Sequence, residues 1–238
     1  MKISEIQIGK ISIPLKKPFK TALRRVDSAE DIIVKVIADT GETGFGNAPP
    51  TAVITGDSQD SVVAAIRDTL GPRMLGMDVE NLEGIMTSLD SGMLHNHSAK
   101  AALDIAVHDL FGKRFGLPLH AFLGGFRKEM ETDLTISLNG PEEMVRDSLE
   151  AVGAGYTAIK LKVGGDVALD QVGVSAVGGQ LVAKLGGDSA DCRFLLRLDH
   201  GQLLGSLSGF LQAFRVEAIV SRGRKGFCGS SHRGVLLF

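Results

Sequence analysis

The segment TAIKLKVGG (157–165) places two lysines, Lys160 and Lys162, in a run of otherwise small and apolar residues. In a β-strand, side chains two positions apart point to the same side, so both ammonium groups leave one face. The two charges repel each other and partial burial removes their hydration, and both effects favour the neutral amine of one lysine. Such an amine can take a proton from carbon if the resulting carbanion is stabilised. The plain alternative is a pair of solvated lysines on an edge strand.

A second candidate is Asp199, which ends the expected strand CRFLLRLD (192–199). A carboxylate at the carboxyl end of a parallel strand can bind Mg²⁺ at the top of a barrel. An aspartate in this position can also cap the turn that follows the strand.

The elements that position these residues begin with an N-terminal part of strands followed by helices. The strands are expected at 31–39, at 43–48 and through the alternating isoleucines Ile6, Ile8, Ile11 and Ile13, where Pro14 ends the run. The helices are expected at 58–70 (capped by Asp57 or Ser58 and stopped by Gly71-Pro72), at 78–89, and at 99–115, where Ser98 is the cap, Gly116 the end, and Ala102, Ile105, Ala106, Asp109 and Leu110 one side. This order predicts an α+β domain over residues 1–125.

The pattern changes after residue 125. Strands are expected at 132–139, 156–164, 192–199 and 216–220, and a helix at 141–155 with Pro141 in its first turn. The alternation predicts parallel βαβ units and hence a parallel sheet or barrel. Between 165 and 192, the glycines at 173, 178–179 and 186–187 argue against one continuous helix, because each interior glycine costs a helix ~1 kcal/mol.

Taken in order, the segments GFGNAPPTAVITGDS, AKAALDIAVHDLFGKRFGLPLHAFLGG, TDLTISLN, AIKLKVG and LRLD resemble the enolase superfamily. Within it they are most similar to the muconate-lactonizing-like subgroup, and there to the dipeptide epimerases. The resemblance implies an α/β protein: an enolase-like α+β capping domain (1–125), a partial TIM-type (β/α) barrel of three to four strands (126–220) and an irregular basic tail (221–238).

The same resemblance implies roles for individual residues. Lys162 is expected to act as the acid/base on the substrate α-carbon, while Lys160 contacts the substrate carboxylate and tunes its neighbour. Thr135 and Arg24 are expected to touch substrate, although a core threonine and a solvated arginine explain them almost as well. Asp199 is expected to bind Mg²⁺, but the family usually continues Ala-Asn-Gln after this residue, whereas here the chain reads His-Gly-Gln.

The chain also departs from the family. After residue 125 it is less than half as long as a complete (β/α)₈ barrel of ~250 residues. The family's remaining metal ligands and its opposing lysine lie on later strands, so truncation or a frame shift after about residue 165–220 is expected, with impaired or absent activity. The alternatives are a sister activity (muconate cycloisomerase, o-succinylbenzoate synthase or N-acylamino-acid racemase) and a non-catalytic remnant or binding module.

The amino-acid composition limits the kinds of binding partner that are expected. The 238 residues are 44% hydrophobic and 23% charged, with a formal net charge of −2, which argues against nucleic acid or a membrane as partner. The start has no signal-peptide pattern, and Cys192 and Cys228 have no metal-site spacing, so a cytoplasmic protein is expected. His95 and His97 are expected on the surface, and His108 to pack within its helix. The expected partner is a small dipeptide, and a homo-oligomer is left open.

Overall fold

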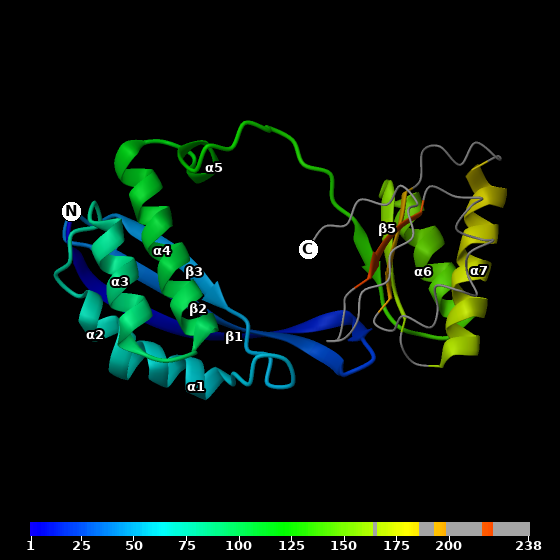
Figure 1. Ribbon diagram of the computed structural model, residues 1–238, viewed down its shortest axis with the longest axis horizontal. Coiled ribbons are helices and arrows are strands. Elements are labelled where there is room, and N and C mark those ends of the chain that lie inside the picture. The colour runs from blue at the N-terminus through cyan, green and yellow to red at the C-terminus, as the bar shows by residue number, and fades with distance from the viewer. Residues whose placement is uncertain (164–165, 186–192, 199–215, 221–238) are drawn as a thin grey trace, which may run out of the picture. The chain divides into compact units, whose positions relative to one another are not determined.

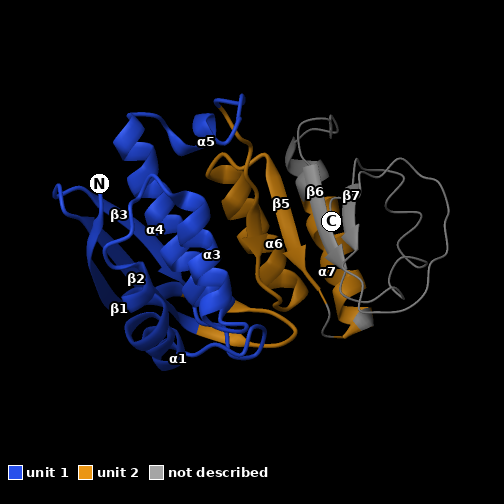
Figure 2. Ribbon diagram, turned by 60° about the vertical axis from the view of Figure 1, so that its left-hand side comes forward, with its two compact units in different colours: residues 1–16, 27–128 blue, residues 17–26, 129–238 orange. Residues whose placement is uncertain are grey.

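A computed structural model describes residues 1–163, 166–185, 193–198 and 216–220. The chain divides into two compact units, each of which is built from two separate segments of the sequence (Figure 2). The first unit comprises residues 1–16 and 27–128, and the second comprises residues 17–26 and 129–238. Residues 17–26, here called the hairpin tip, comprise the end of the first strand, the turn and the start of the second strand, and they belong to the second unit.

The first unit contains a three-stranded sheet in the order β1-β2-β3, formed by β1 (Ile3–Lys20), β2 (Arg25–Ala38) and β3 (Thr43–Ala48) (Figure 1). The expected strand at 43–48 is confirmed, and it pairs antiparallel with β2 in a register that sets Val34 opposite Gly46. The prediction that Pro14 ends the first strand is wrong, because β1 continues to Lys20. Because β1 is an edge strand, one of its sides has no partner strand, and a proline whose nitrogen faces that side costs no hydrogen bond between strands.

Helices follow the sheet along the chain: α1 (Gln59–Ala64), the π-helix η1 (Ala65–Leu70), α2 (Gly71–Met74), α3 (Leu82–Gly92), α4 (His97–Phe115) and α5 (Leu119–Phe122). Together with the sheet they enclose one apolar core, whose fully buried side chains include Ile32, Val34, Val36, Ile66, Leu70, Ile85, Leu103 and Leu110.

Helix α4 lies along β3 at backbone contact (Figure 1). A Cβ atom added to Gly44 would lie 2.0 Å from the carbonyl oxygen of Ala106, and one added to Gly46 would lie 1.9 Å from that of Ala102. Small residues on both elements therefore permit a close approach. Of the residues predicted on one side of this helix, Ala102 and Ala106 are buried, but Ile105 is 45% exposed.

Several helix ends differ from the predicted ones. Ser58 is the N-cap of α1 and forms a capping box with Ser61. The predicted stop at Gly71-Pro72 is wrong, because the π-helical turn continues into α2, where the proline lies in the first turn and its missing N–H is not needed. Ser98 is not a cap: α4 begins one residue earlier, and the Ser98 hydroxyl donates to Asp57 at 2.6 Å. The predicted end of α4 at Gly116 is confirmed, with this glycine at φ 63°.

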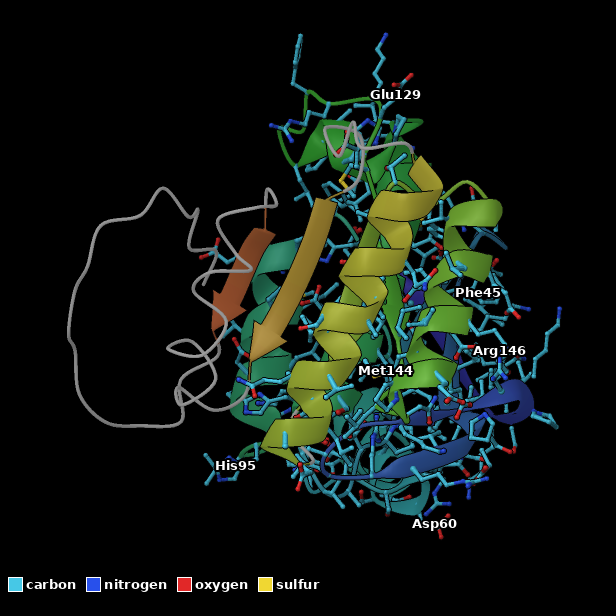
Figure 3. All side chains as sticks on the ribbon, turned by 90° about the vertical axis from the view of Figure 1, so that its right-hand side faces the viewer. Phe45, Asp60, His95, Glu129, Met144 and Arg146 are labelled. Atoms are coloured by element: carbon cyan, nitrogen blue, oxygen red, sulfur yellow. The ribbon has the colours of Figure 1, made fainter. Side chains whose placement is uncertain are left out.

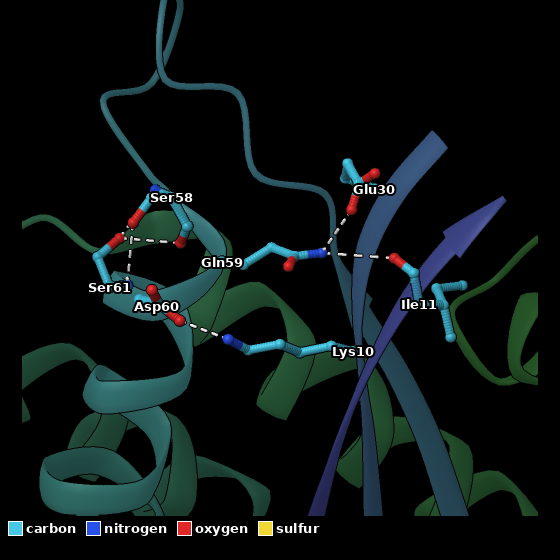
Figure 4. A network of polar contacts seen from close by, with 7 residues as sticks. All are labelled: Lys10, Ile11, Glu30, Ser58, Gln59, Asp60 and Ser61. Carbon is cyan, nitrogen blue, oxygen red and sulfur yellow. Dashed lines mark hydrogen bonds and ion pairs between the residues drawn. The ribbon is translucent and has the colours of Figure 1, made fainter. Parts of the chain in front are cut away.

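The N-terminus of α1 is tied to the first two strands by exposed polar contacts (Figure 4). Gln59 donates from Nε2 to a carboxylate oxygen of Glu30 on β2 at 3.0 Å and to the carbonyl of Ile11 on β1 at 3.4 Å. Lys10 on β1 pairs with Asp60. The segment 51–57, which leads into α1, is thereby fixed at its C-terminal end to the strand pair.

The second unit contains a parallel sheet in the order β4-β5-β6-β7, formed in the described residues by β4 (Leu134–Ile136), β5 (Ala158–Lys162), β6 (Arg193–Leu198) and β7 (Val216–Val220). Helix α6 (Pro141–Gly153) joins β4 to β5, and α7 (Val167–Leu185) follows β5. This is the β/α order of a partial barrel. The predicted fold class, an α+β capping domain with a partial (β/α) barrel of three to four strands, is confirmed.

Helix α7 corrects one prediction, because it runs unbroken through Gly173 and the pair at 178–179. A Cβ on Gly173 would approach the sulfur of Met144 on α6 to 3.3 Å, so this glycine lies where the two helices meet (Figure 3 labels Met144). Contact between the helices, with Val174 and Val177 buried in the same core, offsets the low helix propensity of glycine.

Candidate active site

Strand β5 carries the lysine pair on one face. Its residues alternate between buried and half-buried, with Ile159 at 1% and Leu161 at 0% exposure and both lysines half-buried. The buried residues pack with Met144 of α6 and with α7, so Lys160 and Lys162 lie on the opposite face of the strand from the helices. In a β/α barrel this is the interior face. Lys162 is the last residue of β5, at the carboxyl edge where such folds hold their active sites.

Thr135 is the direct neighbour of Lys160. The parallel register pairs these two residues across β4 and β5, and parallel partners point to the same side of a sheet. Thr135 is half-buried. The structure therefore brings together two of the residues predicted from sequence to contact substrate.

Arg24 lies on the turn of the hairpin tip. The tip closes in a tight turn in which Thr21 N–H donates to the Arg24 carbonyl at 2.9 Å and the Arg24 N–H donates to the Thr21 hydroxyl at 3.2 Å. The Lys20 carbonyl accepts from the backbone N–H of Leu138 at 3.1 Å, two residues after the end of β4. The turn that carries Arg24 is thus joined to the chain just beyond the carboxyl end of β4.

Four further polar contacts fix the hairpin tip, and sequence reasoning missed all of them. Lys17 Nζ lies 2.9 Å from a carboxylate oxygen of Asp147 and 2.7 Å from one of Glu150, both on α6. Lys20 donates a hydrogen bond from Nζ to the side-chain oxygen of Asn139 at 2.9 Å and one from its backbone N–H to the Ser137 hydroxyl at 3.3 Å. The residues of these four contacts are called the hairpin anchor: Lys17, Lys20, Ser137, Asn139, Asp147 and Glu150. The hydrogen bonds that Lys17 donates to Glu150 and, with a smaller effect, to Asp147 raise the pKa of Lys17 above its usual 10.5. In the sequence, the residues PLKKPFK (14–20) follow the predicted strand end at Pro14, and nothing in them indicates partners on a distant helix.

A pocket of about 280 Å³ in the second unit lies at the other end of the sheet. Its lining comes from Thr132 before β4 and from residues 154–157 before β5. The amino ends of barrel strands serve stability rather than catalysis, so this pocket is separate from the candidate site.

The described residues contain no group of three or more histidine, cysteine, aspartate or glutamate side chains placed to hold a metal ion. Asp199, the predicted magnesium ligand, lies outside the described residues. His95 and His97 are exposed as predicted, with ring centroids 6.3 Å apart, and His108 packs on its own helix with Nδ1 2.6 Å from Asp104.

No helix within the described ranges combines the length and the apolar character needed to cross a bilayer.

The fold and the lysine-bearing strand define a class of protein. The N-terminal domain of the mandelate racemase/muconate lactonizing enzyme family matches residues 3–124, about half of the chain. The chain belongs to this family, and the resemblance to the enolase superfamily seen in the sequence is confirmed.

Within this family, the chain is similar to proteins named L-Ala-D/L-Glu epimerase. The chain is 52% identical over 170 residues to an L-Ala-D/L-Glu epimerase of Clostridium acetobutylicum, covering 71% of this chain and 48% of the relative. It is 46% identical over 166 residues to the L-Ala-D/L-Glu epimerase of Bacillus subtilis, covering 70% of this chain and 45% of the relative. The chain thus spans about half the length of the curated relatives it matches.

Solved structures agree with these relatives. A substrate-liganded complex of the L-Ala-D/L-Glu epimerase from Bacillus subtilis superposes with a TM-score of 0.84 at 37% identity, covering 92% of this chain and 61% of that one. A dipeptide epimerase from Enterococcus faecalis, complexed with Mg and the dipeptide L-Leu-L-Tyr, gives a TM-score of 0.81 at 25% identity, covering 92% and 68%.

Proposed function

We propose that this chain carries the proton-transfer lysines of a dipeptide epimerase acting on a dipeptide such as L-Ala-L-Glu. The observation that carries the proposal is the placement of Lys160 and Lys162 on the interior face of β5, with Lys162 at its carboxyl end. The relatives named L-Ala-D/L-Glu epimerase and the substrate-liganded structure support the choice of substrate. Arg24 and Thr135 complete the proposed substrate contacts.

The proposed step is a proton transfer at the α-carbon of the C-terminal residue of the dipeptide. The neutral amine of Lys162 takes the α-proton: the C–H bond breaks, an N–H bond forms, and the electron pair moves into the adjacent carboxylate. Lys160, on the same face two residues earlier, provides a positive charge for that carboxylate, which Thr135 can also reach with its hydroxyl. Return of a proton from Lys162 restores the original configuration, whereas inversion requires an acid on the other face.

Magnesium is part of this proposal but not of the described residues. Structural relatives are complexed with Mg and dipeptide, and the proposed ligand in this chain is Asp199. When bound, Mg²⁺ would stabilise the negative charge that develops on the substrate carboxylate. The expected cytoplasmic location and a homo-oligomeric state remain predictions.

The test is a solvent-exchange assay. The purified chain is incubated with L-Ala-L-Glu and Mg²⁺ in D₂O, and the α-proton signal of the glutamate is followed by NMR. Loss of this signal is expected. Because the described residues provide lysines on one face only, we expect exchange that is faster than inversion.

The variant Lys162→Ala should lower the exchange rate roughly 100-fold or more, as removal of a general base does. The matched control is Lys35→Ala, which removes a half-buried lysine from β2 in the first unit and should leave the rate unchanged. Exchange that survives Lys162→Ala would refute the assignment of the base. A wild-type chain that neither exchanges nor binds the dipeptide would favour the non-catalytic alternative.

A further inference from the structure

The hairpin tip carries Arg24 and belongs to the second unit, where Lys17 and Lys20 make their side-chain contacts. The position of a substrate-binding arginine on such a turn depends on the position of the turn. The contacts that hold the turn therefore decide where the guanidinium lies when a ligand arrives.

The contacts of the hairpin anchor are of two kinds. Lys17 is held by two carboxylates three residues apart on α6, so one ammonium bridges a full turn of the helix. Asp147 is the better-defined partner, since its side chain is only 13% exposed, while those of Lys17 and Glu150 are 57% and 59% exposed. Lys20 adds hydrogen bonds to uncharged acceptors in the segment that follows β4, one from its ammonium group to Asn139 and one from its backbone N–H to Ser137.

The two sets join different parts of the hairpin tip to the second unit. The Lys17 ion pairs join the start of the tip to helix α6. The Lys20 hydrogen bonds join the residue before the turn to the chain just after β4, where the substrate is proposed to bind. The first set is ionic and largely exposed, so it is weakened by salt. The second set consists of hydrogen bonds to uncharged acceptors, so it is weakened less by salt than the ion pairs are.

We propose that Lys17 is a positioning residue: its ion pairs with Asp147 and Glu150 hold the hairpin tip, and with it Arg24, in place for the substrate carboxylate. The inference rests on the proposed function for its effect on substrate, but the holding of the tip can be measured without any ligand. Breaking the pairs raises the fraction of chains in which the tip is released. Apparent affinity falls in proportion to the fraction of chains that stays docked, because only the docked form binds well.

Three variants separate this role from a general effect on stability. Lys17→Met keeps the length of the side chain and removes its charge. Lys17→Arg keeps the charge and a donor that reaches two carboxylates. Lys16→Met is the matched control, since it removes the charge of the exposed neighbouring lysine on the same strand, for which the described residues show no ion pair.

Release of the hairpin tip is measured as the hydrogen-exchange rate of its backbone amides, by mass spectrometry on the ligand-free chain. In Lys17→Met, the amides of residues 18–26 should exchange roughly threefold faster or more, the size expected for losing two exposed ion pairs. Lys17→Arg and Lys16→Met should match the wild type. Raising the salt concentration should accelerate exchange in the wild type towards the rate of Lys17→Met, and should change that variant little.

With L-Ala-L-Glu as the probe, Lys17→Met should raise KM by no more than its exchange acceleration, up to about threefold, and leave kcat unchanged. Unchanged exchange in residues 18–26 of Lys17→Met, or equal acceleration in all three variants, would overturn the inference. A lowered kcat at constant KM would also overturn it, because a positioning role before binding does not alter the chemical step. A wild-type chain with the expected exchange pattern but no turnover would count against the proposed function and leave the holding role of Lys17 supported.

Discussion

The close contact between α4 and β3 makes Gly46 the position where a single methyl group should do the most damage to the first unit. In Gly46→Ala the new Cβ would meet the carbonyl oxygen of Ala102 at 1.9 Å and its carbonyl carbon at 2.9 Å. Ordinary contact begins at 3.4 Å, so helix and strand would have to separate by about 1.5 Å. The obstructing atoms are backbone atoms of a buried helix, which cannot rotate away as a side chain can.

The cost follows from what the separation breaks. A gap of this size removes a large share of the dispersion contact along the buried face of α4, where Ala102, Ala106 and Leu110 are fully buried. It also strains the 2.9 Å bond from the Phe45 N–H to Asp109. We expect a loss of about 3 kcal/mol in the free energy of unfolding, at the upper end of overpacking costs, and a fall in Tm of about 10 °C.

The assay is urea unfolding followed by circular dichroism, with calorimetry for Tm and the soluble fraction as a second readout if the variant does not fold. Gly9→Ala is the matched control, because Gly9 also lies in a strand of the same sheet and its added Cβ would have no heavy atom within 4 Å. The control should change stability by less than about 0.5 kcal/mol. A Gly46→Ala variant as stable as Gly9→Ala would refute the close packing of α4 on β3.

Three smaller predictions concern other contacts. Ser58→Ala removes the N-cap oxygen of α1 and should lower stability by about 1 kcal/mol in urea unfolding; no change would mean that the capping box is not formed in solution. Gly173→Ala should raise stability by up to about 1 kcal/mol through helix propensity, provided that Met144 shifts by a few tenths of an ångström, and a loss above that size would show that the side chain cannot move. The pKa of Asp78 is lowered, chiefly because its carboxylate accepts the Glu80 N–H, so this group stabilises the fold above pH 3.8 and the contribution disappears as pH falls through the folded-state pKa. Asp78→Asn should therefore lower stability at pH 6 but flatten its decline between about pH 4 and 2, and an unchanged acid profile would contradict the assigned cause.

The sequence alone predicted what depends on local pattern. Strand β3, the C-terminal end of α4, the proline start of α6 and the shared face of Lys160 and Lys162 all follow from alternation or from capping residues that are neighbours in sequence. The family resemblance supplied the order of the two parts, which the parallel sheet β4–β7 confirms for the described residues.

Features that depend on distant partners were not predictable in this way. Pro14 ends a strand only if the proline faces a partner strand, and the sequence does not show that β1 is an edge. Gly173 weakens an isolated helix, but the sequence does not show Met144 of α6 beside it. Ser98 was expected to cap its own helix, whereas its hydroxyl bonds Asp57, 41 residues earlier.

The candidate site shows the same division. Thr135 could be placed beside Lys160 once the two strands were expected to be parallel neighbours. The anchoring role of Lys17 could not, since its partners on α6 lie 130 and 133 positions away. The proposed role of Asp199 stays a prediction, because that residue lies outside the described residues.

The assignment of residues 17–26 to the second unit limits how this protein could be recombined with its relatives. A crossover at residue 128 would transfer residues 129–238 as one contiguous piece, but it would leave the hairpin tip behind with the parent chain. The transferred piece would then meet a foreign hairpin tip, and Asp147, Ser137 and Asn139 would face whatever residues that tip brings. Inheritance of the two units as independent modules is therefore restricted, and functional chimeras should favour parents that share a lysine at positions 17 and 20.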